Sequence, residues 1–220
     1  MTPSEEILAI FGATGSTGKY VLKIALMELD WKVKVMVRTP AKLDRDILQH
    51  ENLTVVEGDF NNRDSIRQTI KGCTRVICCA GGPHSNFKYP KKFMKKFVKD
   101  ELWPALQEFK PKSLLLQAGA LSKISRLPSF SQIVVAPFMG LYHMAKDNDA
   151  VLRFIHTHPL EETQVVCTRP GLLRDAKGGS DLKANQHMQN MKALAFVDLA
   201  RFNLKAVLDE DLFGKYPYVH

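Results

Sequence analysis

Three glycines follow a short apolar run near the start of the chain, in a pattern suited to binding phosphate. The segment reads Ile-Leu-Ala-Ile-Phe-Gly-Ala-Thr-Gly-Ser-Thr-Gly from residue 7 to residue 18. In a strand–turn–helix unit, Gly12 permits the tight turn, Gly15 lets the backbone approach a pyrophosphate, and Gly18 lets the helix pack against the strand. The free N–H groups and the positive end of the helix then favour an anion. The alternative is a glycine-rich turn that binds no ligand.

The same residues come close to the phosphate loop of nucleoside-triphosphate enzymes. Residues 13–19 nearly spell that loop, but the next residue is Tyr20, where a Ser or Thr must coordinate magnesium. The sequence therefore predicts a site for phosphate without a metal, and it argues against a kinase or ATPase.

A second candidate lies at the end of the next apolar run. In a dinucleotide-binding fold this strand tip meets the adenosine ribose, where a carboxylate accepts from a 2′-hydroxyl and an arginine accommodates a 2′-phosphate. Here the tip carries Arg38, with Lys42 one turn later and no carboxylate. Because a guanidinium matches phosphate geometry, the pattern favours NADPH over NADH. The alternative is two solvated surface cations.

Two further strand ends carry residues that fit a dinucleotide. Asp59 follows the third predicted strand, where it could accept from the adenine amino group or cap the next helix through Asn61 and Asn62. The fourth strand ends in Ala80, Gly81 and Gly82, whose small size would let a ligand lie on the backbone.

The elements that must position these residues alternate along the chain. Short β-branched runs predict strands at 7–11, 32–37, 53–57, 75–80, 113–118 and 164–168. Amphipathic segments predict helices at 18–29, 40–50, 63–71, 90–109, 142–158 and 197–208. Such alternation predicts an α/β fold, a doubly wound parallel sheet of the Rossmann type, as a single domain over residues 1–220. Loops at about 120–141 and 172–191 follow strand ends, so we expect them on the substrate side.

Composition narrows the class of protein. The chain has 220 residues and a net charge of +8, and no apolar run reaches the roughly 18 residues needed to cross a membrane. Its four cysteines show no metal-ligand spacing, and no metal site is expected. We expect reduced thiols and a cytoplasmic location. The lysine-rich stretch at 88–99 predicts the solvated face of an amphipathic helix, and we expect no nucleic-acid binding because no RNA or DNA motif accompanies it.

These motifs together resemble the atypical short-chain dehydrogenase/reductase group, in its NmrA-like and biliverdin-reductase-B (flavin reductase) branch. The resemblance rests on the glycine turn at 12–18, Val-Arg-Thr-Pro-Ala-Lys-Leu at 37–43, Gly-Asp at 58–59 and Ala-Gly-Gly at 80–82, with weaker matches at 168–175, 196–200 and 213–217. It implies an NADP-binding pocket that also contains Thr14, Ser16, Thr17 and Phe60. The chain departs from the flavin-reductase branch in two places, because it has neither the Ser after the fifth strand nor the His after the sixth.

A different catalytic pair is present in the sequence. Tyr142 and Lys146 have the Tyr-x-x-x-Lys spacing of the wider superfamily, in which one helical turn places the lysine beside the phenol. The lysine charge could lower the phenol pKa and also reach the nicotinamide ribose, and Ser122 could take a third role. In the alternative, Tyr142 packs at the helix start and Lys146 is solvated.

Two functional hypotheses follow. The first is an NADPH-dependent oxidoreductase that transfers hydride to a small organic acceptor such as a quinone, flavin or carbonyl compound. The second is a non-catalytic NADP(H)-binding regulatory protein with a protein partner, as some NmrA-like proteins are.

Overall fold

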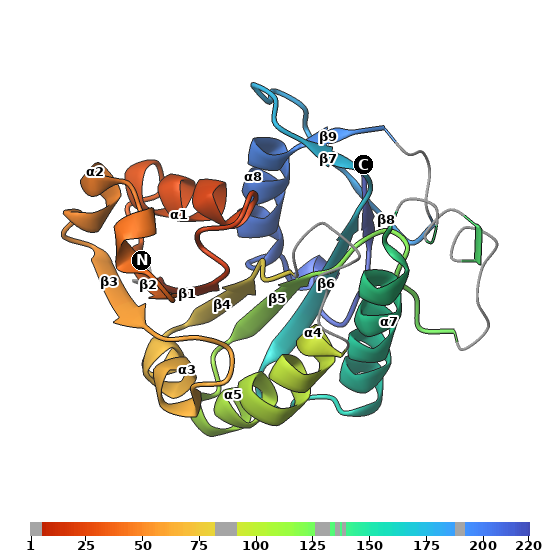
Figure 1. Cartoon of the computed structure of the whole chain (residues 1–220), viewed down its shortest axis with the longest axis horizontal. Coiled ribbons are helices and arrows are strands. Elements are labelled where there is room, and N and C mark those ends of the chain that lie inside the picture. Colours follow the sequence, from red (N-terminus) through yellow and green to blue (C-terminus); the bar gives the residue numbers. More distant parts are fainter. Residues whose placement is uncertain (1–5, 82–91, 126–132, 135–136, 138–139, 188–191) are drawn as a thin grey trace.

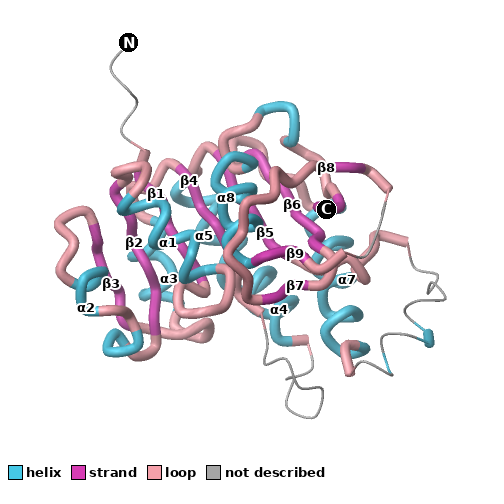
Figure 2. The backbone as a smooth tube through the Cα atoms, turned by 90° about the horizontal axis from the view of Figure 1, so that it is seen from above, coloured by secondary structure: helices cyan, strands magenta, loops and turns pink. Residues whose placement is uncertain are grey.

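One large sheet runs through the molecule (Figure 1). The computed structural model describes residues 6–81, 92–125, 133–134, 137, 140–187 and 192–220. Within these residues eight strands form a sheet in the order β3-β2-β1-β4-β5-β6-β10-β8, and β7 and β9 pair separately. Figure 2 shows the large sheet from above, running from β3 to β8. Strands β3 to β10 of this order are parallel, and β8 alone runs antiparallel at the edge.

The six long strands agree closely with the sequence prediction. They are β1 (Ile7–Phe11), β2 (Lys32–Val37), β3 (Leu53–Glu57), β4 (Arg75–Cys78), β5 (Ser113–Gln117) and β6 (Gln164–Pro170). Four strands of two residues each were not predicted: β7 (Leu173–Arg174), β8 (Ala184–Asn185), β9 (Leu194–Ala195) and β10 (Tyr218–Val219). The predicted loop at 172–191 therefore contains two strands, of which β8 extends the sheet beyond β10.

Helices cover both faces of the sheet (Figure 1). One face carries α1 (Gly18–Met27) and α8 (Phe196–Ala206). The other carries α3 (Arg63–Ile70), the run formed by α4 (Phe93–Lys96), η3 (Phe97–Leu102) and α5 (Trp103–Phe109), and α7 (Tyr142–Thr157). The short η5 (Glu210–Leu212) leads into β10. Doubly wound topology and a single domain were thus predicted correctly.

The prediction of one continuous helix at 40–50 is wrong. The segment 40–50 forms two short pieces, η1 (Pro40–Lys42) and α2 (Arg45–Leu48). Between them Leu43 and Asp44 have extended backbone, with ψ of 145° and 146°. With this break, the buried Leu43 side chain packs in the same core as Ile47.

Alternate residues of each central strand enter different cores. Ala9 and Phe11 of β1 pack on the α3, α5 and α7 side, whereas Leu8 and Ile10 pack on the α1 and α8 side. All four side chains are fully buried. Because both faces are covered, the strand reads as a continuous apolar run.

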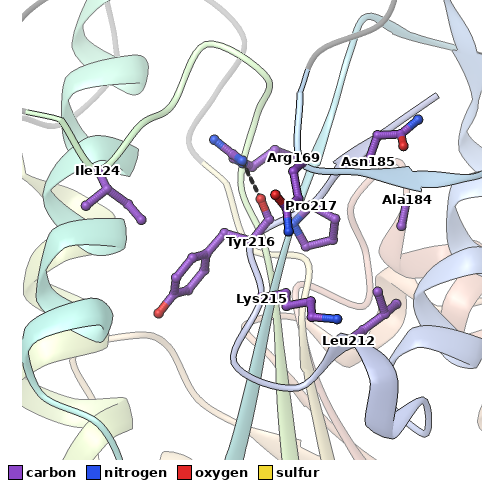
Figure 3. Close-up of a pocket in the computed structure, with 9 residues that line it drawn as sticks. Ile124, Arg169, Ala184, Asn185, Leu212, Lys215, Tyr216 and Pro217 are labelled. Atoms are coloured by element: carbon purple, nitrogen blue, oxygen red, sulfur yellow. Dashed lines mark hydrogen bonds between the residues drawn. The ribbon is translucent and has the colours of Figure 1, made fainter.

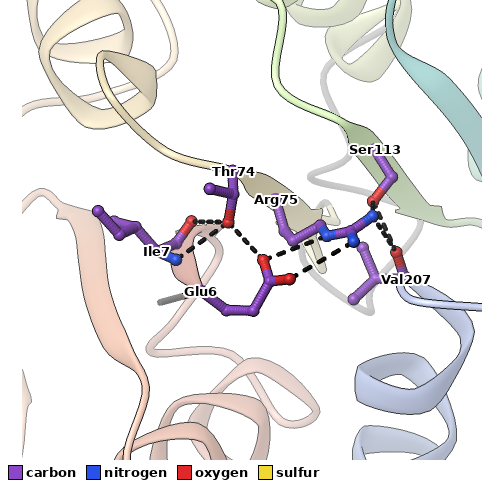
Figure 4. A network of polar contacts seen from close by, with 6 residues as sticks. All are labelled: Glu6, Ile7, Thr74, Arg75, Ser113 and Val207. Atoms are coloured by element: carbon purple, nitrogen blue, oxygen red, sulfur yellow. Dashed lines mark hydrogen bonds and ion pairs between the residues drawn. The ribbon is translucent and has the colours of Figure 1, made fainter. Parts of the chain in front are cut away.

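The amino ends of the central strands are tied by a polar network (Figure 4). Glu6 accepts from Thr74 Oγ1 at 2.5 Å and from Arg75 Nε at 3.3 Å. Arg75 also donates to Ser113 Oγ at 3.1 Å, and Ser113 donates to the Val207 carbonyl at the end of α8. Burial raises the pKa of the Glu6 carboxyl, but the bonds from Thr74 and Arg75 outweigh it and hold that pKa below its usual value. This network lies at the edge of the sheet opposite the candidate site.

Among the described residues, no helix has the length and apolar character that crossing a membrane would require.

Candidate functional site

The glycine turn joins the carboxyl end of β1 to the start of α1. Gly12 has φ of +83°, and a Cβ added there would lie 2.8 Å from the backbone nitrogen of Ala80. A Cβ on Gly18 would lie 2.0 Å from the Gly12 carbonyl oxygen. Both positions therefore require glycine for the reasons expected from the sequence: a left-handed turn at Gly12 and close packing of helix on strand at Gly18. A Cβ on Gly15 would lie 3.2 Å from the Gly12 carbonyl oxygen, and Gly15 is exposed.

The turn leaves backbone donors at an open end of the fold. α1 begins here at Gly18; the N–H groups of Lys19 and Tyr20 donate to the Gly15 and Thr17 carbonyls, whereas that of Gly18 has no backbone acceptor among the described residues. Thr14 and Gly15 are exposed and Ser16 is half-buried, so this end of α1 is accessible to a ligand. Donors and the helix dipole together make it a fitting place for phosphate oxygens.

A relay of hydrogen-bonded side chains, buried except for the half-buried Gln117, connects the turn to the interior of the protein. Thr168 Oγ1 donates to Asn203 Oδ1 at 3.1 Å, and Asn203 Nδ2 donates to Gln117 Oε1 at 3.0 Å. Gln117 Nε2 then donates to Thr17 Oγ1 at 3.2 Å. Since Thr17 accepts at its oxygen, its own O–H is left to donate, and Thr17 borders the open cleft. The relay links β6, α8, β5 and the turn.

The residues predicted for the adenosine end lie at the tips of β2 and β3. Arg38 directly follows β2 and Lys42 ends η1; both are exposed, and neither forms an ion pair within the described part of the chain. Asp59 is exposed and accepts from the Asn61 N–H at 2.8 Å, while Asn62 caps α3 by accepting from Ser65.

Phe60, the next residue, is half-buried and packs against the core. Its ring centroid is 4.4 Å from that of Phe97 and 5.6 Å from that of Phe93. The structure thus turns the Phe60 ring toward the α4–η3 run, and the residue's part in cofactor binding stays a prediction.

A cleft of about 390 Å³ opens at the carboxyl ends of the central strands. The turn contributes Gly15, Ser16 and Thr17, and the segment that follows β4 contributes Cys79, Ala80 and Gly81. The remaining lining comes from the ends of β5 and β6, from α7 and from α8: Gln117, Ala118, Gly119, Leu141, Met144, Asn148, Pro170, Gly171, Leu172, Leu173 and Phe196. Gly82, predicted beside Gly81, lies outside the described residues.

The lining is poor in groups that can exchange protons. Among the described residues, the one ionisable side chain on the cleft is Cys79, and burial raises the pKa of its thiol. Polar side chains are present as Ser16, Thr17, Gln117 and Asn148. The cleft can therefore hold and orient a ligand by hydrogen bonds, with little acid or base chemistry of its own.

A smaller apolar cavity of about 80 Å³ adjoins this cleft. It shares Gly119, Leu141, Met144 and Asn148 with the cleft and adds Ser122. Ser122 is buried, and its hydroxyl donates to the Gly119 carbonyl at 2.5 Å, so it is committed to its own loop.

The structure brings Tyr142 and Lys146 together but not to the cleft. The Lys146 ammonium lies 4.4 Å from the centroid of the Tyr142 ring, as the i,i+4 spacing requires. The cleft is lined here instead by Leu141, which precedes α7, and by Met144 and Asn148 of α7, and Lys146 is exposed. The catalytic role of the pair stays a prediction.

Fold and cleft together define a dinucleotide-binding protein of the Rossmann type: the strand order reverses at β1, and the cleft opens beside that point. A family model described as NAD(P)H-binding matches residues 12–210, so the chain belongs to that family.

The chain is also similar to individual proteins, in sequence to one and in fold to others. The chain is 24% identical to oxidoreductase GME11367 of Pestalotiopsis microspora, over 94% of this chain and 81% of that protein. A short-chain dehydrogenase/reductase from Veillonella parvula, solved with NADP, has a TM-score of 0.75 at 16% identity, covering 97% of this chain and 94% of its own. The anaerobilin reductase ChuY from Escherichia coli O157:H7 also has a TM-score of 0.75, at 15% identity over 97% of this chain and 96% of its own.

The sequence did not predict the relay, nor which residues of α7 line the cleft. Gln117 and Asn203 were not singled out, because no local pattern joins residues 86 positions apart. Met144 and Asn148 have the same four-residue spacing as Tyr142 and Lys146, so the spacing alone did not tell which pair faces the cleft.

Proposed function

We propose that this protein is an NADPH-dependent oxidoreductase that transfers hydride to a flat, apolar acceptor of the quinone or flavin type. The observation that carries the proposal is the cleft itself, which runs from the phosphate-binding turn to the apolar cavity under Leu141 and Met144. When bound, the cofactor supplies the hydride.

The residues of the turn fit a pyrophosphate. Gly12 and Gly18 leave no room for side chains, which brings the backbone N–H groups of the turn within reach of an anion. Thr17, oriented by Gln117, has an O–H to donate at the edge of the cleft. The chain thus offers hydrogen-bond donors where a phosphate would lie.

A preference for NADPH over NADH is supported at the tip of β2. Arg38 and Lys42 are exposed cations at the position where a 2′-phosphate would lie, and the residues between them carry no carboxylate. A guanidinium can bind such a phosphate through two parallel bonds.

The lining favours an acceptor that needs no positioned acid. A simple ketone gains about 10²–10⁴-fold from a proton donor held at its oxygen. The described lining supplies no such donor, because the Cys79 thiol has a raised pKa and the other polar groups are hydroxyls and amides. A quinone or flavin can take its proton from solvent, and Asn148 could orient its carbonyl groups.

The names of the relatives agree with a redox role: one is called an oxidoreductase and another a reductase. The same lack of ionisable groups favours a second candidate, a protein that binds NADP(H) and does not turn it over.

Steady-state oxidation of NADPH with a panel of quinones, free flavins, aldehydes and ketones separates the two. We expect turnover with quinones or flavins, slower turnover with NADH, and little with simple ketones. Tight NADPH binding without oxidation by any acceptor would favour the second candidate, and faster turnover of ketones than of quinones would overturn the acceptor class.

A further inference from the structure

A second cavity lies on the other side of β6, next to Arg169 (Figure 3). It measures about 430 Å³ and has no lining residue in common with the dinucleotide cleft. Arg169 and Pro170 are consecutive in β6, so their side chains point to opposite faces; Pro170 borders the cleft and Arg169 borders this cavity. The volume is in the range of small-molecule sites, roughly 300–1,000 Å³.

The Arg169 guanidinium is buried among neutral groups. Its Nε donates to the Tyr216 carbonyl at 2.8 Å, a second nitrogen donates to the same oxygen, and Nη1 donates to the Ser122 carbonyl at 3.3 Å. The guanidinium carbon lies 3.7 Å from the centroid of the Tyr218 ring. Arg169 is only 9% exposed.

No carboxylate neutralises this charge in the described residues. Arg169 takes part in no ion pair there, and the segments outside the described residues contain one acidic residue, Glu5. A buried charge without a counter-ion is costly, and carbonyls and an aromatic ring offset only part of that cost. Three of the five guanidinium N–H groups are used, so two are left for another acceptor.

The rest of the cavity suits an organic body. Ile124, Leu212 and Pro217 provide apolar surface, and Lys215 adds a second, exposed cation at the wall. Figure 3 shows the guanidinium of Arg169 reaching from β6 toward the side of Ile124, above the Tyr216 ring. Two cations and apolar walls complement a molecule with one negative end and one apolar end.

We propose that this cavity binds a small organic carboxylate, whose oxygens accept from Arg169 and whose apolar body lies against Ile124 and Leu212. The site is separate from the dinucleotide cleft, and it does not depend on the proposed activity.

The test uses the full chain and three probe carboxylates, benzoate, phenylacetate and 3-phenylpropionate, each paired with its neutral amide. Binding is measured by calorimetry and by the shift in melting temperature, with and without saturating NADPH. We expect at least one carboxylate to bind while its amide does not, with an affinity that NADPH leaves unchanged. Failure of all three carboxylates, equal binding of acid and amide, or competition with NADPH would overturn the proposal.

Variants locate the site. Arg169→Lys keeps the positive charge but removes the two parallel N–H donors of the guanidinium. It should weaken carboxylate binding about tenfold or more, the scale of one charge-assisted hydrogen bond. Lys215→Gln should weaken it several-fold, whereas the control Lys205→Gln, on the exposed face of α8, should not. Arg169 also binds the Tyr216 carbonyl in the C-terminal segment, so Arg169→Lys could disturb the fold. Unchanged NADPH affinity is the check that this variant is folded. Unchanged carboxylate affinity in both Arg169→Lys and Lys215→Gln would exclude this cavity.

Discussion

Gln117 Nε2 donates to Thr17 Oγ1 across 3.2 Å, which ties the last residue of β5 to the phosphate turn. The two residues are 100 positions apart, and the bond is the final step of a relay that starts at Thr168 and passes through Asn203. Each donor in the relay meets an acceptor, so the hydroxyl of Thr17 is left as a donor toward the cleft. The cofactor turn is thus oriented by the interior of the protein.

Breaking the relay should cost stability and cofactor affinity together. Asn203→Leu removes the partner of the buried Thr168 hydroxyl and of the half-buried Gln117 carbonyl oxygen, and should lower the free energy of unfolding by about 1–3 kcal/mol. Denaturant unfolding measures the loss, and NADPH titration should show weaker binding. The exposed Gln107→Leu is the control. An Asn203→Leu protein with unchanged stability would mean that the relay contributes nothing.

The network at the amino ends of the strands should make stability depend on pH. The Glu6 carboxyl has a pKa below the usual 4.5, so its stabilising effect is present above pH 4.5 and is lost as pH falls through the lowered pKa. Glu6→Gln should cost about 1–3 kcal/mol at neutral pH, the scale of bonds to a charged group, and progressively less below pH 4.5. Unfolding curves from pH 7 to pH 3 check this, with exposed Glu51→Gln as the control. A cost that stays constant over this range would contradict the assignment.

The choice of cofactor should depend on Arg38. In wild type, NADPH should bind more tightly than NADH, and Arg38→Ala should narrow the difference by about 1–3 kcal/mol, the scale of a charge-assisted hydrogen bond. Calorimetric titration of both cofactors measures it. Arg45→Ala, an exposed arginine in α2, should leave the difference unchanged. Equal affinities for the two cofactors in wild type would contradict the prediction.

The two faces of α7 should respond differently to mutation. Asn148→Leu alters a polar group on the cleft and should change the KM for the acceptor several-fold without changing NADPH affinity. Tyr142→Phe should keep turnover within a few-fold, because the α7 residues that border the cleft are Met144 and Asn148. A loss of about 10²–10⁴-fold in Tyr142→Phe with intact NADPH binding would instead establish the pair Tyr142 and Lys146 as the proton donor.

The local sequence pattern was sufficient to predict the six long strands. The bounds of β1, β2 and β3 agree with those predicted, because both faces of these strands are covered and their apolar runs end where the chain turns. Gly12 and Gly18 could be assigned from the strand–turn–helix pattern, because the positive φ of Gly12 and the close approach of Gly18 to the Gly12 carbonyl arise within that unit. The close approach of Gly12 to Ala80, which follows β4, was not predicted.

Contacts between elements that are distant in the sequence could not be predicted from the local sequence pattern. The strand β10 is two residues long, and it forms because residues 215–217 run beside β6. The residue types of Tyr218 and Val219 do not predict this pairing. The face of α7 that meets the cleft is set by how the helix packs: Asp147 accepts from the Met94 N–H at 2.7 Å, and Asp149 accepts from the Lys123 N–H at 2.8 Å. These contacts fix the rotation of the helix and place Asn148 between them at the cleft.

Hydride transfer from a dinucleotide held in this cleft is the central claim, and single-turnover oxidation of bound NADPH tests it most directly. The protein is loaded with NADPH deuterated at one or the other hydrogen of the nicotinamide C4 and mixed with a quinone, and the loss of NADPH fluorescence is followed. Because the cleft should hold the nicotinamide in one orientation, we expect oxidation to be slowed by deuterium at one of the two positions only. Bound NADPH that stays reduced, or equal rates with both deuterated cofactors, would contradict the account.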